Sequence, residues 1–110
     1  MIEEYNPDWP RQYAEAAAAL VAASDGRWLV EHIGSTSIEG LPAKPIIDLA
    51  VRVTQLPEIE PHLPALETLG WHDLVAGPRT HRVLVRRRGR VRTHIAHFFS
   101  ADQWQAPCTP

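Results

Sequence analysis

The pattern of apolar and polar positions along the chain predicts short strands combined with two helices. Apolar side chains recur at helical spacing from Tyr13 to Ala23, and Asp25-Gly26 is a typical helix end. A second helix is expected to begin near His62, which places Pro64 in its first turn. Alternating or continuous apolar runs, typical of strands, occupy residues 28–33, 46–53, 71–75, 81–87 and 90–99.

The order of these elements predicts the fold class. The strand at 46–53 is apolar on both faces at its start, which is typical of a central, buried strand. Arg88-Gly89 predicts a hairpin between the last two strands. The order is helix, strand, strand, helix, strand and hairpin. It predicts an α+β fold in which helices pack on one face of a mixed sheet. With 110 residues, 45% of them hydrophobic, we expect a single domain over residues 1–110.

Composition limits the classes of partner and the cellular compartment that we expect for the protein. The formal net charge of -2 gives no general reason to expect nucleic acid or a membrane as a partner. No apolar run approaches the roughly 18 residues that a membrane span needs. Cys108 is the only cysteine, which favours a reducing compartment. We therefore expect a cytoplasmic protein.

Positive charge is concentrated in one segment. Seven of the eleven basic residues lie between Arg79 and Arg92, and Lys44 is the only lysine. Arginine suits bidentate contacts with phosphate or carboxylate, so Arg82 and Arg92 are candidate anion-binding residues. An equally good interpretation is a solvated strand edge whose charges discourage aggregation.

Two neighbouring features could carry chemistry. Gly34-Ser35 follows a predicted strand, where the hydroxyls of Ser35, Thr36 and Ser37 are candidate donors to an anion, although an ordinary turn explains the same residues. Asp48 lies within the apolar strand at 46–53. A buried carboxylate needs a partner, so Asp48 forms a salt bridge, for example with Arg52, or serves in metal binding or catalysis.

A longer motif around these residues resembles a known family. The motif comprises Glu31-His32-Ile33-Gly34-Ser35-Thr36-Ser37, Gly40-Leu41, Ala43-Lys44-Pro45-Ile46-Ile47-Asp48, and later Leu69-Gly70-Trp71 and Arg92-Thr93-His94 with His97. It resembles the signature of the GrpB family, which is assigned to the nucleotidyltransferase superfamily with its DNA-polymerase-β-like core. The family pattern continues past residue 110 with further helices. The chain therefore looks C-terminally shortened, and a second subunit is a candidate to cover the exposed surface.

The resemblance implies roles for several residues. Twelve residues separate Ser35 from Asp48, as in the superfamily motif, which implies Gly34 and Ser35 against phosphate and Asp48 on Mg²⁺. Lys44 would neutralise phosphate charge. The second acid of the motif falls on Ala50, which has no ligand atom. The implied partner is a nucleotide or another anionic small molecule.

The histidines leave alternatives open. Glu31 and His32 should point to opposite faces, and His32 is a candidate acid or base because it adjoins Gly34-Ser35. We expect His94 to share the open face with Asp48 if their strands are neighbours, and His97 to be a core histidine. Three functions follow: group transfer on a nucleotide, acid–base chemistry by Glu31, His32, Asp48 and His94, or a non-catalytic binding module.

Overall fold

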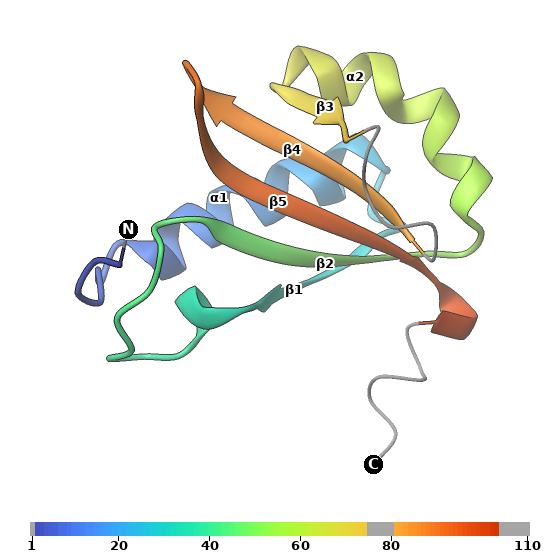
Figure 1. Ribbon diagram of the computed structural model, residues 1–110. Helices are drawn as coiled ribbons and strands as arrows, with labels where there is room; N and C mark the ends of the chain where they lie inside the picture. Colours follow the sequence, from blue (N-terminus) through green and yellow to red (C-terminus); the bar gives the residue numbers. More distant parts are fainter. Residues whose placement is uncertain (1, 75–80, 104–110) are drawn as a thin grey trace.

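The computed structural model describes residues 2–74 and 81–103, so Arg79 and Cys108 lie outside the described residues. The predicted α+β architecture is confirmed: helices cover one face of a mixed five-stranded sheet (Figure 1). The elements in chain order are α1 (Trp9–Ala23), β1 (Leu29–Ile33), η1 (Ser35–Ser37), β2 (Ile47–Val53), η2 (Leu56–His62), α2 (Leu63–Thr68), β3 (Trp71–Asp73), β4 (Arg82–Arg88) and β5 (Val91–Ser100).

The sheet order is β1-β2-β5-β4-β3. β2 pairs with β5 in parallel, and the other three pairings are antiparallel. The strand predicted to be central therefore has a neighbour on each side. The parallel pair joins strands far apart in sequence, and helices η2 and α2, with β3 and β4, make the connection between them.

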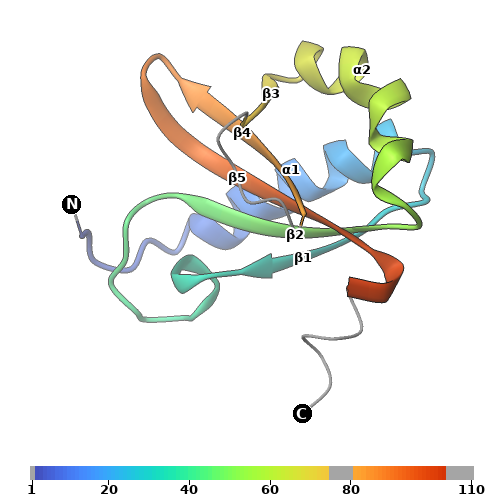
Figure 2. The ribbon, with the colours of Figure 1, turned by 45° about the vertical axis from the view of Figure 1, so that its right-hand side comes forward.

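Side-chain alternation divides the sheet into a helix-covered face and an open face. In β2, Ile47, Leu49, Val51 and Val53 are at most 1% exposed and join the core with Leu20 of α1 and Leu66 of α2. The intervening residues, Asp48 and Ala50 among them, point to the open face. Figure 2 shows α1 running behind the sheet and α2 above it. Burial of each large apolar side chain contributes roughly 1.5–3 kcal/mol, so this core fixes which face remains open.

Two local features agree with the sequence pattern. The spacing of Ser100 and Gln103 is that of a capping box, and the structure forms it: the Ser100 backbone amide donates to Gln103 Oε1 at 2.9 Å and the Gln103 backbone amide donates to Ser100 Oγ at 3.4 Å. The second helix begins one residue after His62 and is preceded by the 3-10 helix η2, because Pro57 and Pro61 interrupt the α-helical hydrogen bonds. No helix in residues 2–74 and 81–103 is long and apolar enough to cross a membrane.

Candidate functional site

Asp48 and Gly34 form the centre of the candidate site. Asp48 is the second residue of β2, and its side chain lies on the open face with 29% exposure. Gly34, at the end of β1, packs directly on this carboxylate: a Cβ at position 34 would lie 2.6 Å from Asp48 Oδ2. Gly34 has φ 75° and ψ −174°, a conformation that only glycine adopts readily. A side chain at position 34 is therefore excluded by both space and backbone conformation.

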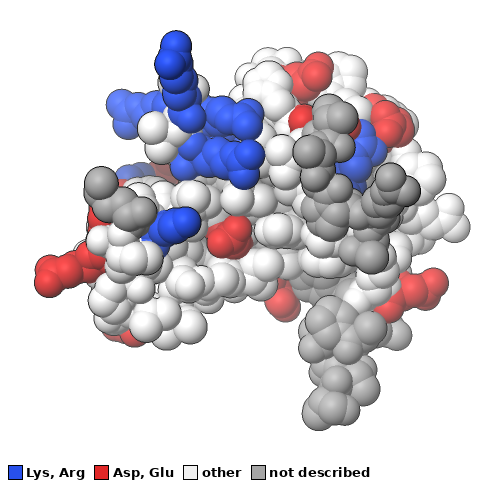
Figure 3. Space-filling model, viewed as in Figure 1, with Lys and Arg blue, Asp and Glu red and all other residues white. Residues whose placement is uncertain are grey.

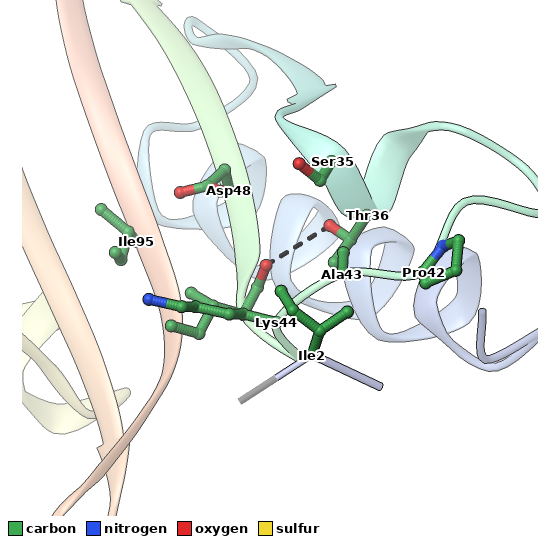
Figure 4. A pocket seen from close by; sticks show the side chains of 9 residues that line it. Ile2, Ser35, Thr36, Pro42, Ala43, Lys44, Asp48 and Ile95 are labelled. Atoms are coloured by element: carbon green, nitrogen blue, oxygen red, sulfur yellow. Dashed lines mark hydrogen bonds between the residues drawn. The ribbon is translucent and has the colours of Figure 1, made fainter. Parts of the chain in front are cut away.

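A cavity of about 340 Å³ opens beside Asp48. Its described lining consists of Ile2, Ser35, Thr36, Pro42, Ala43, Lys44, Ile46, Asp48 and Ile95. In Figure 4, the Lys44 side chain extends toward Ile95 of β5, and the Asp48 carboxylate points toward the same strand. The structure thus brings together four of the predicted site residues: the hydroxyls of Ser35 and Thr36, the ammonium of Lys44 and the carboxylate of Asp48.

The wall of this cavity is held by a short chain of hydrogen bonds that includes His32. His32 Nε2 lies 2.9 Å from Thr36 Oγ1, and the Thr36 hydroxyl donates to the Ile46 carbonyl at 3.4 Å (Figure 4). The His32 ring stacks on Tyr13 of α1 with centroids 4.6 Å apart. Burial lowers the pKa of His32, and the nearby charge of Asp48 opposes that shift. As predicted, Glu31 and His32 face opposite ways, so His32 acts on the cavity through Thr36.

His97 lies beside Asp48 on the open face. Its Nε2 lies 3.6 Å from Asp48 Oδ1, and its Nδ1 lies 3.1 Å from His81 Nε2, which makes a line of three titratable groups on the open face. His81 also stacks on Phe99, with centroids 4.5 Å apart. The expected salt bridge from Asp48 to Arg52 is not formed among the described residues.

The sequence prediction interchanged the roles of His94 and His97. Asp48 pairs with Ile95 across β2 and β5, whereas His94 pairs with Ile47 and so points toward the helices. The expectation that His94 shares the open face is therefore wrong, as is the placement of His97 in the core. His94 is 9% exposed. Burial, followed by the charge of Arg86, lowers the pKa of His94 to about 4. The alternation of His97 with apolar residues could not reveal its face, because that depends on pairing with a distant strand.

The remaining predicted residues lie outside the cavity lining. Arg82 points to the helix-covered face, where it donates to Asp73 Oδ1 at 3.0 Å and to Glu60 Oε1 at 2.7 Å. These partners show that the Arg82 guanidinium is already bound within the protein. Arg92 is exposed near the β4–β5 turn. Glu31 is exposed on the open face, in a row with Ala50 and His97.

The residues around Asp48 do not fit a pair of Mg²⁺ ions. Two neighbours of Asp48 on the open face, Ala50 and Ile95, have no ligand atom. Among the described residues, no group of three or more histidine, cysteine or acidic side chains is arranged to hold a metal. A two-metal site needs several shared carboxylates, and Asp48 is the only acid among the described lining residues.

Several relatives resemble this chain in sequence. The UPF0157 protein SCO7215 of Streptomyces coelicolor is 39% identical over 95 residues, covering 86% of this chain and 50% of that protein. The UPF0157 protein BH1888 of Halalkalibacterium halodurans is 35% identical, with 84% and 49% covered. The chain thus spans about half the length of these curated relatives.

Solved structures and a family model agree with this relationship. The conserved protein GrpB from Enterococcus faecalis superposes with a TM-score of 0.87 at 35% identity, covering 97% of this chain and 66% of that one. The Cid1 poly(U) polymerase, a nucleotidyltransferase, superposes with a TM-score of 0.59 at 12% identity, covering 88% and 34%. That second match shows the fold alone, and it confirms the predicted nucleotidyltransferase-like core. The GrpB protein family model matches residues 1–108, and the chain therefore belongs to the GrpB family.

Proposed function

We propose that the cavity beside Asp48 binds a nucleotide or another phosphate-bearing small molecule and supports group transfer from it. The observation that carries the proposal is the joint placement of Ser35, Lys44 and Asp48 in one cavity wall. A lysine ammonium and a hydroxyl donor suit a phosphate group. The cavity volume of about 340 Å³ lies within the range of small-molecule sites.

The single carboxylate limits the metal chemistry of the proposal. Mg²⁺ is commonly bound by one or two carboxylates together with the phosphates of the substrate. Asp48 therefore suits a Mg²⁺ ion that arrives with a nucleotide and would supply charge neutralisation there. The Cid1 structure carries MgATP, which supports the choice of this ligand class for a protein of the same fold.

Calorimetric titration of the 110-residue chain with each of the four nucleoside triphosphates, with and without Mg²⁺, tests the proposal. Lys44→Gln removes the ammonium from the cavity wall, and Arg27→Gln is the matched control because Arg27 is exposed outside the cavity. A charge-assisted hydrogen bond contributes about 1.5–3 kcal/mol, so Lys44→Gln should weaken binding roughly ten- to hundredfold. The proposal fails if no triphosphate binds or if both variants behave alike. Pyrophosphate release from a bound triphosphate would test group transfer.

A second candidate function, acid–base chemistry on a small molecule, rests on the 3.6 Å approach of His97 to Asp48. A histidine oriented by a carboxylate is a common general base. Hydrolysis of p-nitrophenyl phosphate and p-nitrophenyl acetate should then be lost in His97→Gln and retained in His72→Gln, since His72 is exposed on the edge strand β3. Equal rates for both variants would remove His97 from the mechanism.

A further inference from the structure

A second cavity, of about 460 Å³, lies between α1 and the end of the β4–β5 hairpin. It opens on the helix-covered face, on the other side of β5 from Asp48, because it is lined by His94 and Arg86, which pair with each other there. Its charged described lining comprises Asp8, the N-cap of α1, Arg11 and Glu15 of α1, and three hairpin arginines, Arg86, Arg87 and Arg88. Figure 3 shows basic side chains gathered at this end of the molecule.

The carboxylates of the cavity are already matched by a cation from their own helix. Arg11 Nε donates to Asp8 Oδ1 at 2.5 Å, Arg11 NH2 donates to Asp8 Oδ2 at 2.7 Å, and Arg11 NH1 donates to Glu15. Hydrogen bonding to Arg11, followed by that to Gln12, lowers the pKa of Asp8 to about 2. Within residues 2–74 and 81–103, none of the hairpin arginines forms an ion pair. With four arginines and two carboxylates, the described lining carries two net positive charges.

A shift in the register of β4 and β5 lies where the hairpin arginines line the cavity. Successive side chains of a regular strand point to opposite faces, so Arg87 should point away from Arg86. The register between β4 and β5 shifts at this step, and Thr93 is the extra residue opposite it. The Thr93 hydroxyl donates to the Arg86 carbonyl at 3.2 Å and lies 2.8 Å from His94 Nδ1. Bulges of this kind redirect side chains and are frequent beside functional sites.

The arrangement keeps the hairpin arginines close together, with no ion-pair partner in the part of the chain that the structure describes. Arg87 lies directly opposite Arg92 across the hairpin, and like charges at such a position destabilise a sheet. Arg86 is half-buried and lies over Gly70, where a Cβ would be 3.4 Å from Arg86 Nε. The Arg86 side chain thus packs on the backbone at position 70. Edge protection needs only exposed charges and does not explain a half-buried one.

We propose that this second cavity binds a small anion with at least two phosphate groups, held by the hairpin arginines. The planar guanidinium forms paired hydrogen bonds with phosphate oxygens, and several arginines suit an anion of multiple charge. The volume exceeds that of a single phosphate and lies within the range of small-molecule sites. This site is independent of the proposed nucleotide cavity.

Calorimetry with inorganic pyrophosphate, and with citrate as a carboxylate of similar charge, tests this site on the 110-residue chain. Arg86→Gln should weaken pyrophosphate binding about tenfold or more, which corresponds to about 1.4 kcal/mol. Arg90→Gln is the matched control, since it removes the same charge from the same hairpin outside the cavity lining, and its affinity should change less than about twofold. Arg86→Lys keeps the positive charge but lacks the paired donors, so it should lose less pyrophosphate affinity than Arg86→Gln. This variant keeps the test available if Arg86→Gln folds poorly.

The outcomes separate the alternatives. Pyrophosphate binding that Lys44→Gln leaves intact, together with a change in the His94 ring ¹⁵N shift, supports the second site. Equal weakening by Arg86→Gln and Arg90→Gln would overturn it in favour of diffuse charge attraction, of the kind a nucleic acid also experiences. Loss of binding in Lys44→Gln would assign the anion to the Asp48 cavity instead. Citrate binding as tight as pyrophosphate binding, or no binding of pyrophosphate, would also contradict the proposal.

Discussion

Substitution of Gly34 by alanine should destabilise the protein through the carboxylate of Asp48. The backbone at Gly34, with φ 75° and ψ −174°, costs a residue with a side chain roughly 1–3 kcal/mol. The added Cβ would also lie 2.6 Å from Asp48 Oδ2 and 3.1 Å from Asp48 Cβ. The Asp48 side chain must then leave its rotamer, which costs roughly 0.5–1.5 kcal/mol. We expect Gly34→Ala to lower the free energy of unfolding by about 2–4 kcal/mol.

Gly40→Ala provides the control that separates these two effects. Gly40 also has a positive φ, of 81°, but a Cβ there would have no atom within 4 Å. Its cost should therefore be that of the backbone alone, about 1–2 kcal/mol. The free energies of unfolding in urea of the two variants give the difference between the cost of Gly34→Ala and the cost of Gly40→Ala.

A double-mutant cycle with Asp48→Ala identifies the clashing group. Removal of the carboxylate leaves only the 3.1 Å contact with Cβ, so Gly34→Ala should cost about 1 kcal/mol less in the Asp48→Ala background. Additive effects of the two substitutions, or equal costs for Gly34→Ala and Gly40→Ala, would refute the close packing of turn and acid. If the Gly34→Ala protein remained fully folded but no longer bound nucleotide, this packing would be connected to the proposed function.

Two further predictions concern the helix-covered face. Arg82→Gln should lower the free energy of unfolding by about 1.5–3 kcal/mol, because Asp73 and Glu60 lose a shared guanidinium. The control Arg52→Gln, at an exposed position, should change this free energy by less than about 0.5 kcal/mol. If Arg82→Gln left the stability unchanged, the assigned contacts would be contradicted. His94 has a folded-state pKa of about 4, below its ordinary value of 6.5, so the unfolded chain binds more protons in this window and stability falls as the pH drops from 6.5 to 4. The free energy of unfolding in urea should be measured at about pH 7 and at about pH 4.5 for the wild type and for His94→Gln. Between these two pH values the wild type should lose on the order of 2 kcal/mol more of this free energy than His94→Gln does. Equal losses in the two proteins would show that His94 is not buried as a neutral ring.

The parts of the fold that could be predicted are those fixed by local pattern. β2 was identifiable because a strand with an apolar run is expected to be buried on both faces within a sheet. The Ser100–Gln103 capping box was identifiable because its two hydrogen bonds join residues three positions apart. The face on which each histidine of β5 lies was not predictable. It depends on the register of a parallel pair whose strands are more than forty residues apart, and a shift of one residue exchanges His94 for the opposite face.

The same limit applies to the arginines. The clustering of the arginines is visible in the sequence, but the sequence does not show which arginine forms internal ion pairs and which one borders a cavity. Arg82 completes an internal ion-pair network because Asp73 and Glu60 approach it from other elements. Arg86 instead borders the cavity between α1 and the hairpin, next to Gly70 and to the register shift between β4 and β5. Both outcomes are set by tertiary contacts, so charge counting alone could not show that Arg82 is bound by Asp73 and Glu60.

Stability does not account for the residues chosen at Gly34 and Asp48. The contact of Asp48 with His97 is long, at 3.6 Å, and partly exposed, and even a charged pair of this kind contributes no more than about 1 kcal/mol. A neutral side chain at position 48 would avoid the cost of a half-buried charge, and any common residue at position 34 would be less strained in an ordinary turn conformation. The chain instead places a glycine-only backbone conformation against an acid, at the edge of a cavity that also contains a lysine. Because unfavourable local choices that converge on one point are characteristic of functional sites, this packing is the strongest physical argument that the cavity beside Asp48 has a ligand.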